Sequence, residues 1–192
     1  IALGAEPRLA AAALRTAPER RAIVADLLAL VEARSPLRGE QGRTDDFRQR
    51  LAALHLWRDA GHRGARQGSA DVGALAAIDK ASAGWRRRLG VRTAASGVPD
   101  AHTVGDLLTH AFPDRVARRD DRQPLRYLLA NGRGARPHEN SALHGEPWLV
   151  AMDLRLEARD SLIYAAAPLD PDAPAQEHAQ RFVAAPVLRW PD

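Results

Sequence analysis

Residues 111–136, AFPDRVARRDDRQPLRYLLANGRGAR, mark the point at which the sequence changes from a helical to a strand-forming pattern. Two short runs, 115–119 and 126–130, are separated by turn-forming residues, and glycines interrupt the chain after the second run. Further strand candidates lie downstream, at residues 148–157, 161–167 and 182–190. About five short strands in succession are typical of a small barrel such as an OB-fold. The last candidate abuts the end of the sequence, so the barrel can be incomplete.

The first half of the sequence carries helical signals. The apolar residues after Pro18 recur at helical spacing, which predicts a helix with one buried face. Thr44-Asp45-Asp46 has the composition of an N-cap and predicts the start of another helix. Arginine and glycine residues at 59–71 predict a flexible connection. Further helices are expected at residues 7–15, 72–89 and 104–111.

Gly97, Pro99 and Asp100 interrupt the helical pattern, and we place a domain boundary there. The expected fold class is therefore α+β. A helical bundle at residues 1–97 is expected to precede a small OB-like β-barrel at residues 104–192.

The composition excludes several kinds of site. The sequence has 192 residues and no cysteine, which excludes disulfides, a thiolate nucleophile and Cys-ligated zinc. No apolar run reaches the roughly eighteen residues of a membrane helix. We therefore expect no membrane partner and, without a signal peptide, a cytoplasmic location. The first residue is Ile1 rather than methionine, from which we expect a piece of a longer chain.

No motif for catalysis or cofactor binding is complete in this sequence. Asn131-Gly132-Arg133-Gly134 is glycine-rich, but no Gly-Lys-Ser/Thr comes after it, so a tight turn between strands explains it better than a P-loop. His138 and His144 match no zinc spacing, and Ser141 lacks the Gly-x-Ser-x-Gly context of a hydrolase nucleophile. We therefore expect this chain to hold no cofactor or metal ion and to hydrolyse no nucleotide.

Arginines are concentrated between Arg115 and Arg136, in a protein whose only lysine is Lys80. If this stretch forms paired strands, several guanidinium groups share one side of the sheet. A basic surface with an occasional aromatic, here Tyr127, is the footprint of single-strand binding. A solvated arginine face in an arginine-rich protein explains the same composition, and the neighbouring aspartates weaken the field. Composition alone leaves both interpretations open.

Five segments of the chain resemble the HrpB family of bacterial DEAH-box helicases. They occur in order, and the most specific lie in the second half: LGAEPRLA at 3–10, AFPDRVARR at 111–119, RYLLANGRGA at 126–135, GEPWLVA at 145–151 and AAPLD at 166–170. The resemblance implies a parent ATP-dependent RNA helicase whose RecA-like motor domains precede Ile1 and bind ATP and magnesium. It also implies that the helical half is a helicase-associated region with a ratchet-like bundle, and that the second half is an OB-fold.

The function implied by this resemblance is that of an accessory C-terminal region. It would grip or guide single-stranded RNA, or another nucleic acid, beside the motor domains of the same parent chain. The alternative is a protein-interaction module that docks the motor domains or a regulatory partner. The arginines that end the helix at 72–89 could line the same channel, or could cap the helix carbonyls. The residues expected to face nucleic acid are Arg86, Arg87, Arg115, Arg118, Arg119, Arg126, Tyr127, Asn131, Arg133 and Arg136.

Overall fold

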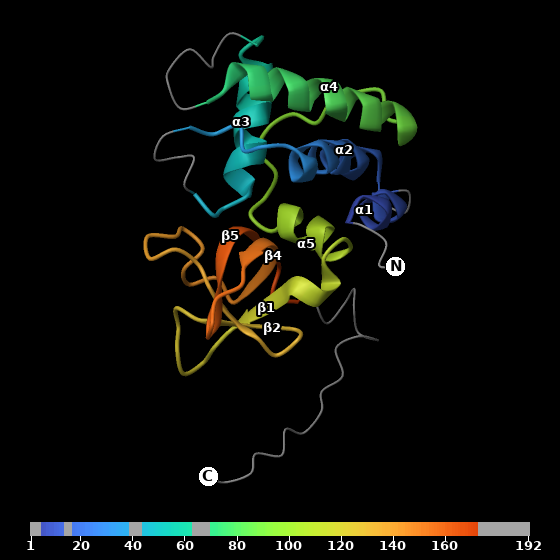
Figure 1. Cartoon of the computed structure of the whole chain (residues 1–192). Helices are drawn as coiled ribbons and strands as arrows, with labels where there is room; N and C mark the ends of the chain where they lie inside the picture. The colour runs from blue at the N-terminus through green and yellow to red at the C-terminus, as the bar shows by residue number, and fades with distance from the viewer. Residues whose placement is uncertain (1–4, 14–16, 39–43, 63–69, 173–192) are drawn as a thin grey trace, which may run out of the picture.

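A computed structural model describes residues 5–13, 17–38, 44–62 and 70–172. Within these residues the helices precede the strands, which confirms the α+β class. In Figure 1 the helices α4, α2 and α5 and then a β-barrel succeed one another as layers, while α3 runs from the level of α4 towards the barrel. The helices are α1 Ala5–Ala13, α2 Pro18–Glu32, α3 Arg48–Asp59, α4 Val72–Arg88 and α5 Thr103–Thr109, and η3, a 3-10 turn, spans Pro113–Arg115.

Local signals explain where the helices begin and end. Pro18 occupies the first position of α2, where its missing N–H costs no hydrogen bond. The side chain of Asp71 accepts a hydrogen bond from the N–H of Ala74 at 3.1 Å and so caps α4. Gly90 comes just after α4 with a φ of 68°, a conformation that glycine adopts without strain. The connection expected at 59–71 lies largely outside the described residues.

The N-cap expected before α3 is only partly as predicted. Asp46 does satisfy the first turn, because its Oδ1 accepts the N–H of Arg48 at 3.0 Å. The residue at the N-cap position is Phe47, however, and no side chain caps the helix there.

The strands form a closed barrel in the order β1-β2-β3-β5-β4, with β1 paired to β4. All pairings are antiparallel except β3 with β5, which is parallel. The expectation that the barrel can be incomplete is wrong, because it closes without residues 182–190, which lie outside the described residues. Four of the five strands of the barrel, β1, β2, β4 and β5, correspond to strands predicted from the sequence, and β3 does not. The strands are β1 Val116–Arg119, β2 Tyr127–Leu129, β3 Gly134–Arg136, β4 Trp148–Arg155 and β5 Asp160–Pro168.

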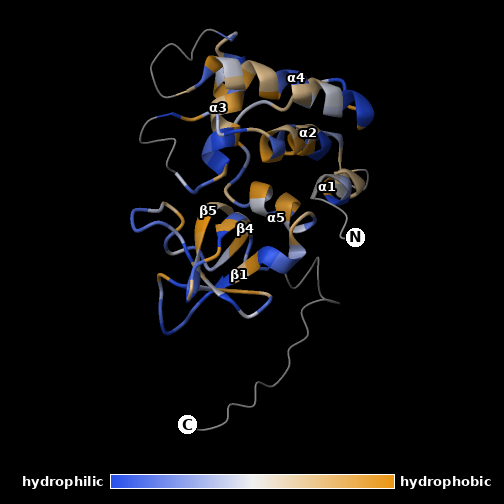
Figure 2. Ribbon diagram, viewed as in Figure 1, coloured by the Kyte–Doolittle hydropathy of each residue, from blue (hydrophilic) through white to orange (hydrophobic). Residues whose placement is uncertain are grey.

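The two faces of β4 and β5 serve two different cores. Leu149 and Ile163 point into the barrel, where they pack with Tyr127 and Leu143. Val150 and its outward-facing neighbours instead belong to the core that the helices form. Figure 2 shows this apolar layer as orange residues on α2, α5 and the strands beneath them. The core thus continues across the boundary placed between residues 97 and 104, and the division into two domains stays a prediction.

Asp45 joins the segment before α3 to the barrel. It is only 2% exposed, although it carries a carboxylate. Its Oδ2 accepts the N–H of His138 at 3.0 Å, and its Oδ1 accepts the hydroxyl of Ser141 at 2.7 Å. Its carbonyl accepts the N–H of Ala166 in β5 at 2.8 Å. One buried residue therefore fixes the helical part against two separate segments of the barrel part.

Replacement of Asp45 by alanine is expected to lower the free energy of unfolding by about 2 kcal/mol, because two partly buried donors lose a charged acceptor. Urea denaturation followed by far-UV circular dichroism and by tryptophan fluorescence would measure this. The two signals should change together in one transition at a lower midpoint. Asp121→Ala, at an exposed carboxylate, serves as the control and should leave the midpoint unchanged. Two separate transitions in the wild-type chain would instead show that the helical part and the barrel unfold independently.

Candidate nucleic-acid interface

Three of the arginines predicted to face nucleic acid hold the barrel together. Arg115 donates through Nη1 to the carbonyl of Met152 in β4. Arg119 donates through Nη1 to the carbonyl of Gly145 at 2.5 Å. Arg126 forms ion pairs with Asp160 at 3.0 Å and with Asp120 at 3.1 Å. Because these guanidinium groups already bind acceptors of the barrel, their first role is structural.

The pair formed by Arg126 and Asp160 explains the glycine at position 134. A Cβ added to Gly134 would lie 1.9 Å from the carboxylate of Asp160 and 2.3 Å from the guanidinium of Arg126. The pair thus crosses directly over β3, and the carboxylates of Asp160 and then Asp120 hold the pKa of Arg126 above its usual value. The sequence interprets this glycine as part of a turn, but its lack of a side chain makes room for the ion pair between Arg126 and Asp160.

Tyr127 lies inside the barrel and is fully buried. Its hydroxyl lies within hydrogen-bond distance of two backbone carbonyls, 3.0 Å from that of Leu143 and 2.9 Å from that of Glu146. Burial raises the pKa of its phenol to about 12. The ring therefore offers no face on which a base could stack in this structure.

The remaining predicted residues of the barrel are exposed. Arg118 lies on the outer face of β1, opposite Leu128 of β2, and pairs at 2.5 Å with the exposed Asp121. Asn131 shapes the β2–β3 turn, since its Oδ1 accepts the N–H of Arg133 at 3.0 Å. Arg133 reaches the carbonyl of Glu157 at 3.3 Å. These side chains are accessible to a phosphodiester backbone.

Arg136 lies on the outer face of β3, and the sequence interpretation missed its neighbours. In the barrel, Arg136 and Arg155 flank Leu162 of β5 from the two adjacent strands. Arg155 and Arg159 are both exposed and belong to the β4–β5 hairpin, whose tip meets the β2–β3 turn through Glu157. The parallel pairing of β3 with β5 brings these residues together, and an interpretation that lacked β3 could not predict it.

The two predicted arginines of α4 lie in different environments. Arg87 is exposed at the end of the helix. Arg86 is 13% exposed, donates through Nη1 to the hydroxyl of Ser82 at 2.8 Å, and lies 3.7 Å from Asp26. Arg86 therefore belongs to a buried polar cluster between the helices.

Asp26 of α2 is the centre of this buried polar cluster and is fully buried. Arg58 of α3 binds it with both ends of its fork, at 2.8 and 2.9 Å. His55 contacts the same carboxylate through Nε2 at 2.8 Å, and Nδ1 of the same ring faces the carbonyl of Gly97 at 2.5 Å. A neutral imidazole donates through one nitrogen only, so both contacts are N–H donations only in the doubly protonated ring. The cluster ties α2, α3 and α4 to the segment that leads to α5.

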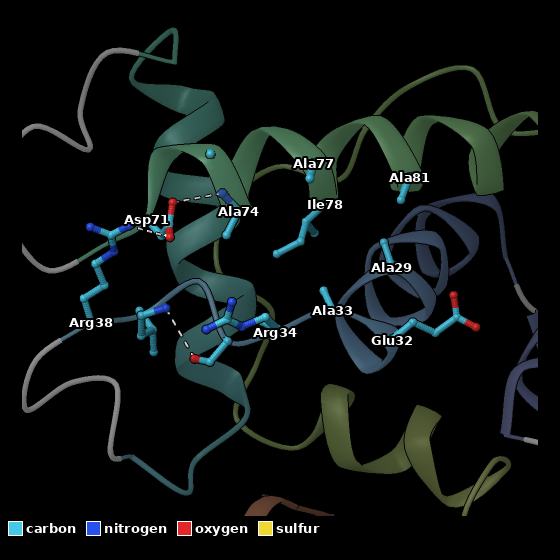
Figure 3. Close-up of a pocket in the computed structure, with 13 residues that line it drawn as sticks. Ala29, Glu32, Ala33, Arg34, Arg38, Asp71, Ala74, Ala77, Ile78 and Ala81 are labelled. Carbon is cyan, nitrogen blue, oxygen red and sulfur yellow. Dashed lines mark hydrogen bonds and ion pairs between the residues drawn. The ribbon is translucent and has the colours of Figure 1, made fainter.

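A hollow of about 740 Å³ lies between α2 and α4. Figure 3 shows alanines of both helices, together with Ile78, along its floor. Charged residues stand at its rim, where Arg38 and Asp71 form an ion pair of 2.6 Å. Small side chains leave this space open, and two of the charged residues that line it, Arg38 and Asp71, are already bound to each other.

Metal clusters and membrane-spanning helices are both absent from the part of the chain that the structure describes. Among these residues, no three or more histidine, aspartate or glutamate side chains cluster in a way that could hold a metal ion. No helix among the described residues is both long and apolar enough to cross a membrane.

Comparisons with known proteins converge on one kind of helicase. No protein-family model matches the chain. The chain is 34% identical, over 137 aligned residues that cover 66% of its length, to the ATP-dependent RNA helicase HrpB of Escherichia coli K12, and the match covers 16% of that protein. Two crystal structures of E. coli HrpB, described as a DExH-box NTPase and as a DEAH/RHA helicase, are similar to it with TM-scores of 0.62 and 0.55. Their identities are 31% and 29%, over 91% and 86% of this chain. The chain spans less than a fifth of the length of these proteins.

Proposed function

Because this chain is homologous to a segment of the bacterial HrpB-type DEAH-box helicases, we propose that it is an accessory region that guides single-stranded RNA beside the motor domains of such a helicase. The observation that carries the proposal is the set of exposed arginines on the barrel of a helicase-related chain. Of the residues predicted to face nucleic acid, those accessible on the barrel are Arg118, Asn131, Arg133 and Arg136.

The proposal includes the identity of the barrel as an OB-fold. Its support is topological, since a closed five-stranded barrel with this mixture of one parallel and four antiparallel pairings is compatible with a small Greek-key barrel. OB-type barrels bind single strands by combining basic grooves with aromatic side chains. The exposed arginines described above would supply the basic part.

ATP hydrolysis belongs, in this proposal, to RecA-like motor domains of the same parent chain. These domains would bind ATP and magnesium, whereas this sequence contains no P-loop. The partners proposed for this region are therefore single-stranded RNA and the motor domains. The location proposed for the parent protein is the cytoplasm.

A second candidate function is a protein-docking module, and one observation favours it. Leu125 and Leu128, on and beside β2, are 64% and 41% exposed. Exposed leucines on one outer face are more typical of a protein contact than of a phosphate contact. The two functions would share only part of the barrel surface, because Arg118 lies opposite Leu128 on this face whereas Arg133 and Arg159 lie at the hairpin tips.

Binding of single-stranded RNA by the 192-residue chain should weaken steeply with salt. The logarithm of affinity is expected to fall with the logarithm of salt concentration by about 0.7 for each phosphate neutralised. Fluorescence anisotropy of a labelled oligonucleotide over a salt series would measure this slope. Replacing Arg118 and Arg133 by glutamine should reduce the slope by about one to two.

Asp121→Asn is the matched control, since it removes a competing carboxylate beside Arg118 and should strengthen binding slightly. No binding at low salt would contradict the RNA-guiding function. Binding to isolated motor domains that is lost on replacing Leu125 and Leu128 by serine would then favour the docking function.

A further inference from the structure

The outer face of the barrel carries one half-buried tyrosine that neither barrel core uses. Tyr164 lies near the middle of β5, at an irregularity in its pairing with β4. Ile163, before it, packs inside the barrel, whereas Ala165, after it, packs into the core that the helices form. Because the side chain of Tyr164 is half-buried and belongs to neither core, it lies outside the barrel interior, in contrast to the fully buried Tyr127.

Two contacts hold the ring of Tyr164 in place. The ring of His138 meets it edge to face, with 5.5 Å between the centroids and 89° between the planes. Arg155, on the neighbouring strand, interacts electrostatically with its hydroxyl. A ring fixed at its edge and at its hydroxyl loses little conformational entropy when a ligand stacks on it, and such pre-organisation favours binding.

Arginines surround this ring. Arg136 of β3 and Arg155 of β4 both pair with Leu162 of β5, which is two residues before Tyr164. Arg133 and Arg159 are exposed at the two hairpin tips, and Arg133 reaches the carbonyl of Glu157 at 3.3 Å. Glu157 is the carboxylate among them, 3.7 Å from Arg136 and itself 39% exposed. The exposed carboxylate of β4, Asp153, interacts with Arg50 of α3.

We propose that Tyr164, Arg136 and Arg155, here called the Tyr164 surface, form a binding site for single-stranded RNA in which one base stacks on the tyrosine ring and the arginines bind the flanking phosphates. The inference rests on the proposed RNA-guiding function and gives it a location. Every base has a face that can stack, so this site would hold RNA without regard to sequence. Arginine suits the flanking positions because its planar fork binds phosphate through two N–H groups.

The stacking contact is tested by comparing Tyr164→Leu with Tyr164→Phe in the full 192-residue chain. Base stacking on an aromatic ring contributes about 1–3 kcal/mol, so Tyr164→Leu should weaken binding of an oligoadenylate by about fivefold or more. Tyr164→Phe keeps the ring and should bind within about twofold of wild type. An abasic oligomer of the same length is the second probe, and its affinity should not change in either variant.

The phosphate contacts are tested by the double replacement of Arg136 and Arg155 by glutamine. This variant should lower the salt slope by about 1.4, which corresponds to two phosphates of a single strand. The double variant of Arg34 and Arg92, two exposed arginines of the helical part that are not among the residues predicted to face nucleic acid, is the matched control and should leave the slope unchanged. Thermal unfolding of each variant verifies that it is folded. If Tyr164→Leu does not fold, the Arg136/Arg155 variant, read against Tyr164→Phe and wild type, still tests the site.

The outcomes separate this site from the broader function. If wild type does not bind RNA at low salt, the proposed RNA-guiding function fails, and the Tyr164 surface fails with it. If wild type binds RNA and both the Tyr164→Leu and the Arg136/Arg155 variants bind it as tightly as wild type, the Tyr164 surface is not the binding site, while the RNA-guiding function stands. An equal fall of the salt slope in the Arg34/Arg92 control would show diffuse charge attraction and would also overturn the site.

Discussion

Replacement of Asp26 by asparagine is expected to lower the free energy of unfolding by about 3–5 kcal/mol, the usual cost of removing one partner from a buried ion pair. Asparagine fills nearly the same volume, so the loss is electrostatic rather than steric. It leaves the guanidinium of Arg58, whose side chain is only 10% exposed, without its main counter-charge. It also takes a charged acceptor from His55 and Ser82. Urea denaturation of the two proteins at neutral pH measures the difference.

Asp79→Asn is the matched control for this cluster. Asp79 pairs with Nε of the same Arg58 at 2.7 Å, but its side chain is 27% exposed. Water screens this pair, so the expected loss is about 1 kcal/mol or less. If the two substitutions cost the same, then the bidentate pair between Asp26 and Arg58 is not the element that stabilises the helices.

The pH dependence of stability gives a second readout of Asp26. Burial alone would raise the pKa of its carboxyl, but hydrogen bonds from His55, Arg58 and Ser82 outweigh burial and hold the pKa below its usual value. A carboxyl with a depressed folded pKa stabilises the protein above its unfolded pKa of about 4, and this stabilisation is lost as pH falls through the folded pKa. The difference between wild type and Asp26→Asn should therefore be full above about pH 4 and shrink below it. A difference that stays constant into acid would contradict the assignment.

The sequence predicts the helices and most strands well, because local chemistry decides where they begin and end. Pro18, Asp71 and Gly90 act within one turn of the helix that they start or stop, so a sequence pattern contains the necessary information. The strand β3 is different. It is three residues long, begins at Gly134 and is held by a parallel pairing to β5, so its partner is far away in the sequence. No local pattern predicts such a strand.

The candidate site is harder to predict than the fold, because the sequence shows charges but not their partners. Arg126 reads as one more cation of a basic stretch, yet Asp160, its partner, is 34 residues away. Asp26 falls on the face of α2 that the apolar pattern predicts to be buried, and only the neighbouring helices reveal what neutralises it. Which tyrosine is accessible to RNA also depends on partners that the sequence does not show. Tyr127 of β2 points into the barrel core, whereas Tyr164 lies at an irregularity of β5 and belongs to neither core, near arginines from two other strands.

Alanine in place of Gly105 is expected to destabilise the protein by about 3 kcal/mol or more, the upper range of overpacking, even though alanine favours a helix by about 1 kcal/mol. The short helix α5 meets the end of β5 at this glycine. An added Cβ would lie 2.0 Å from the carbonyl oxygen of Pro168 and 2.6 Å from its carbonyl carbon. Both atoms are backbone, so no rotamer change can make room. The helix would have to withdraw and expose the core that Leu107 and Leu108 fill.

Gly84→Ala is the matched control, because Gly84 also lies in a helix but has open space where a Cβ would be added. It should stabilise the protein by about 0.5–1 kcal/mol. Thermal unfolding should therefore shift down for Gly105→Ala and up for Gly84→Ala, and two upward shifts would contradict the close approach of α5 to β5. The contact has a second support, since Asp106 accepts the N–H of Asp170 at 3.0 Å just beyond β5. Shifts of opposite sign in the unfolding temperature of the two glycine variants would thus place the junction between the helices and the barrel at α5. There the absence of a side chain at Gly105 lets the backbones of α5 and β5 come into contact.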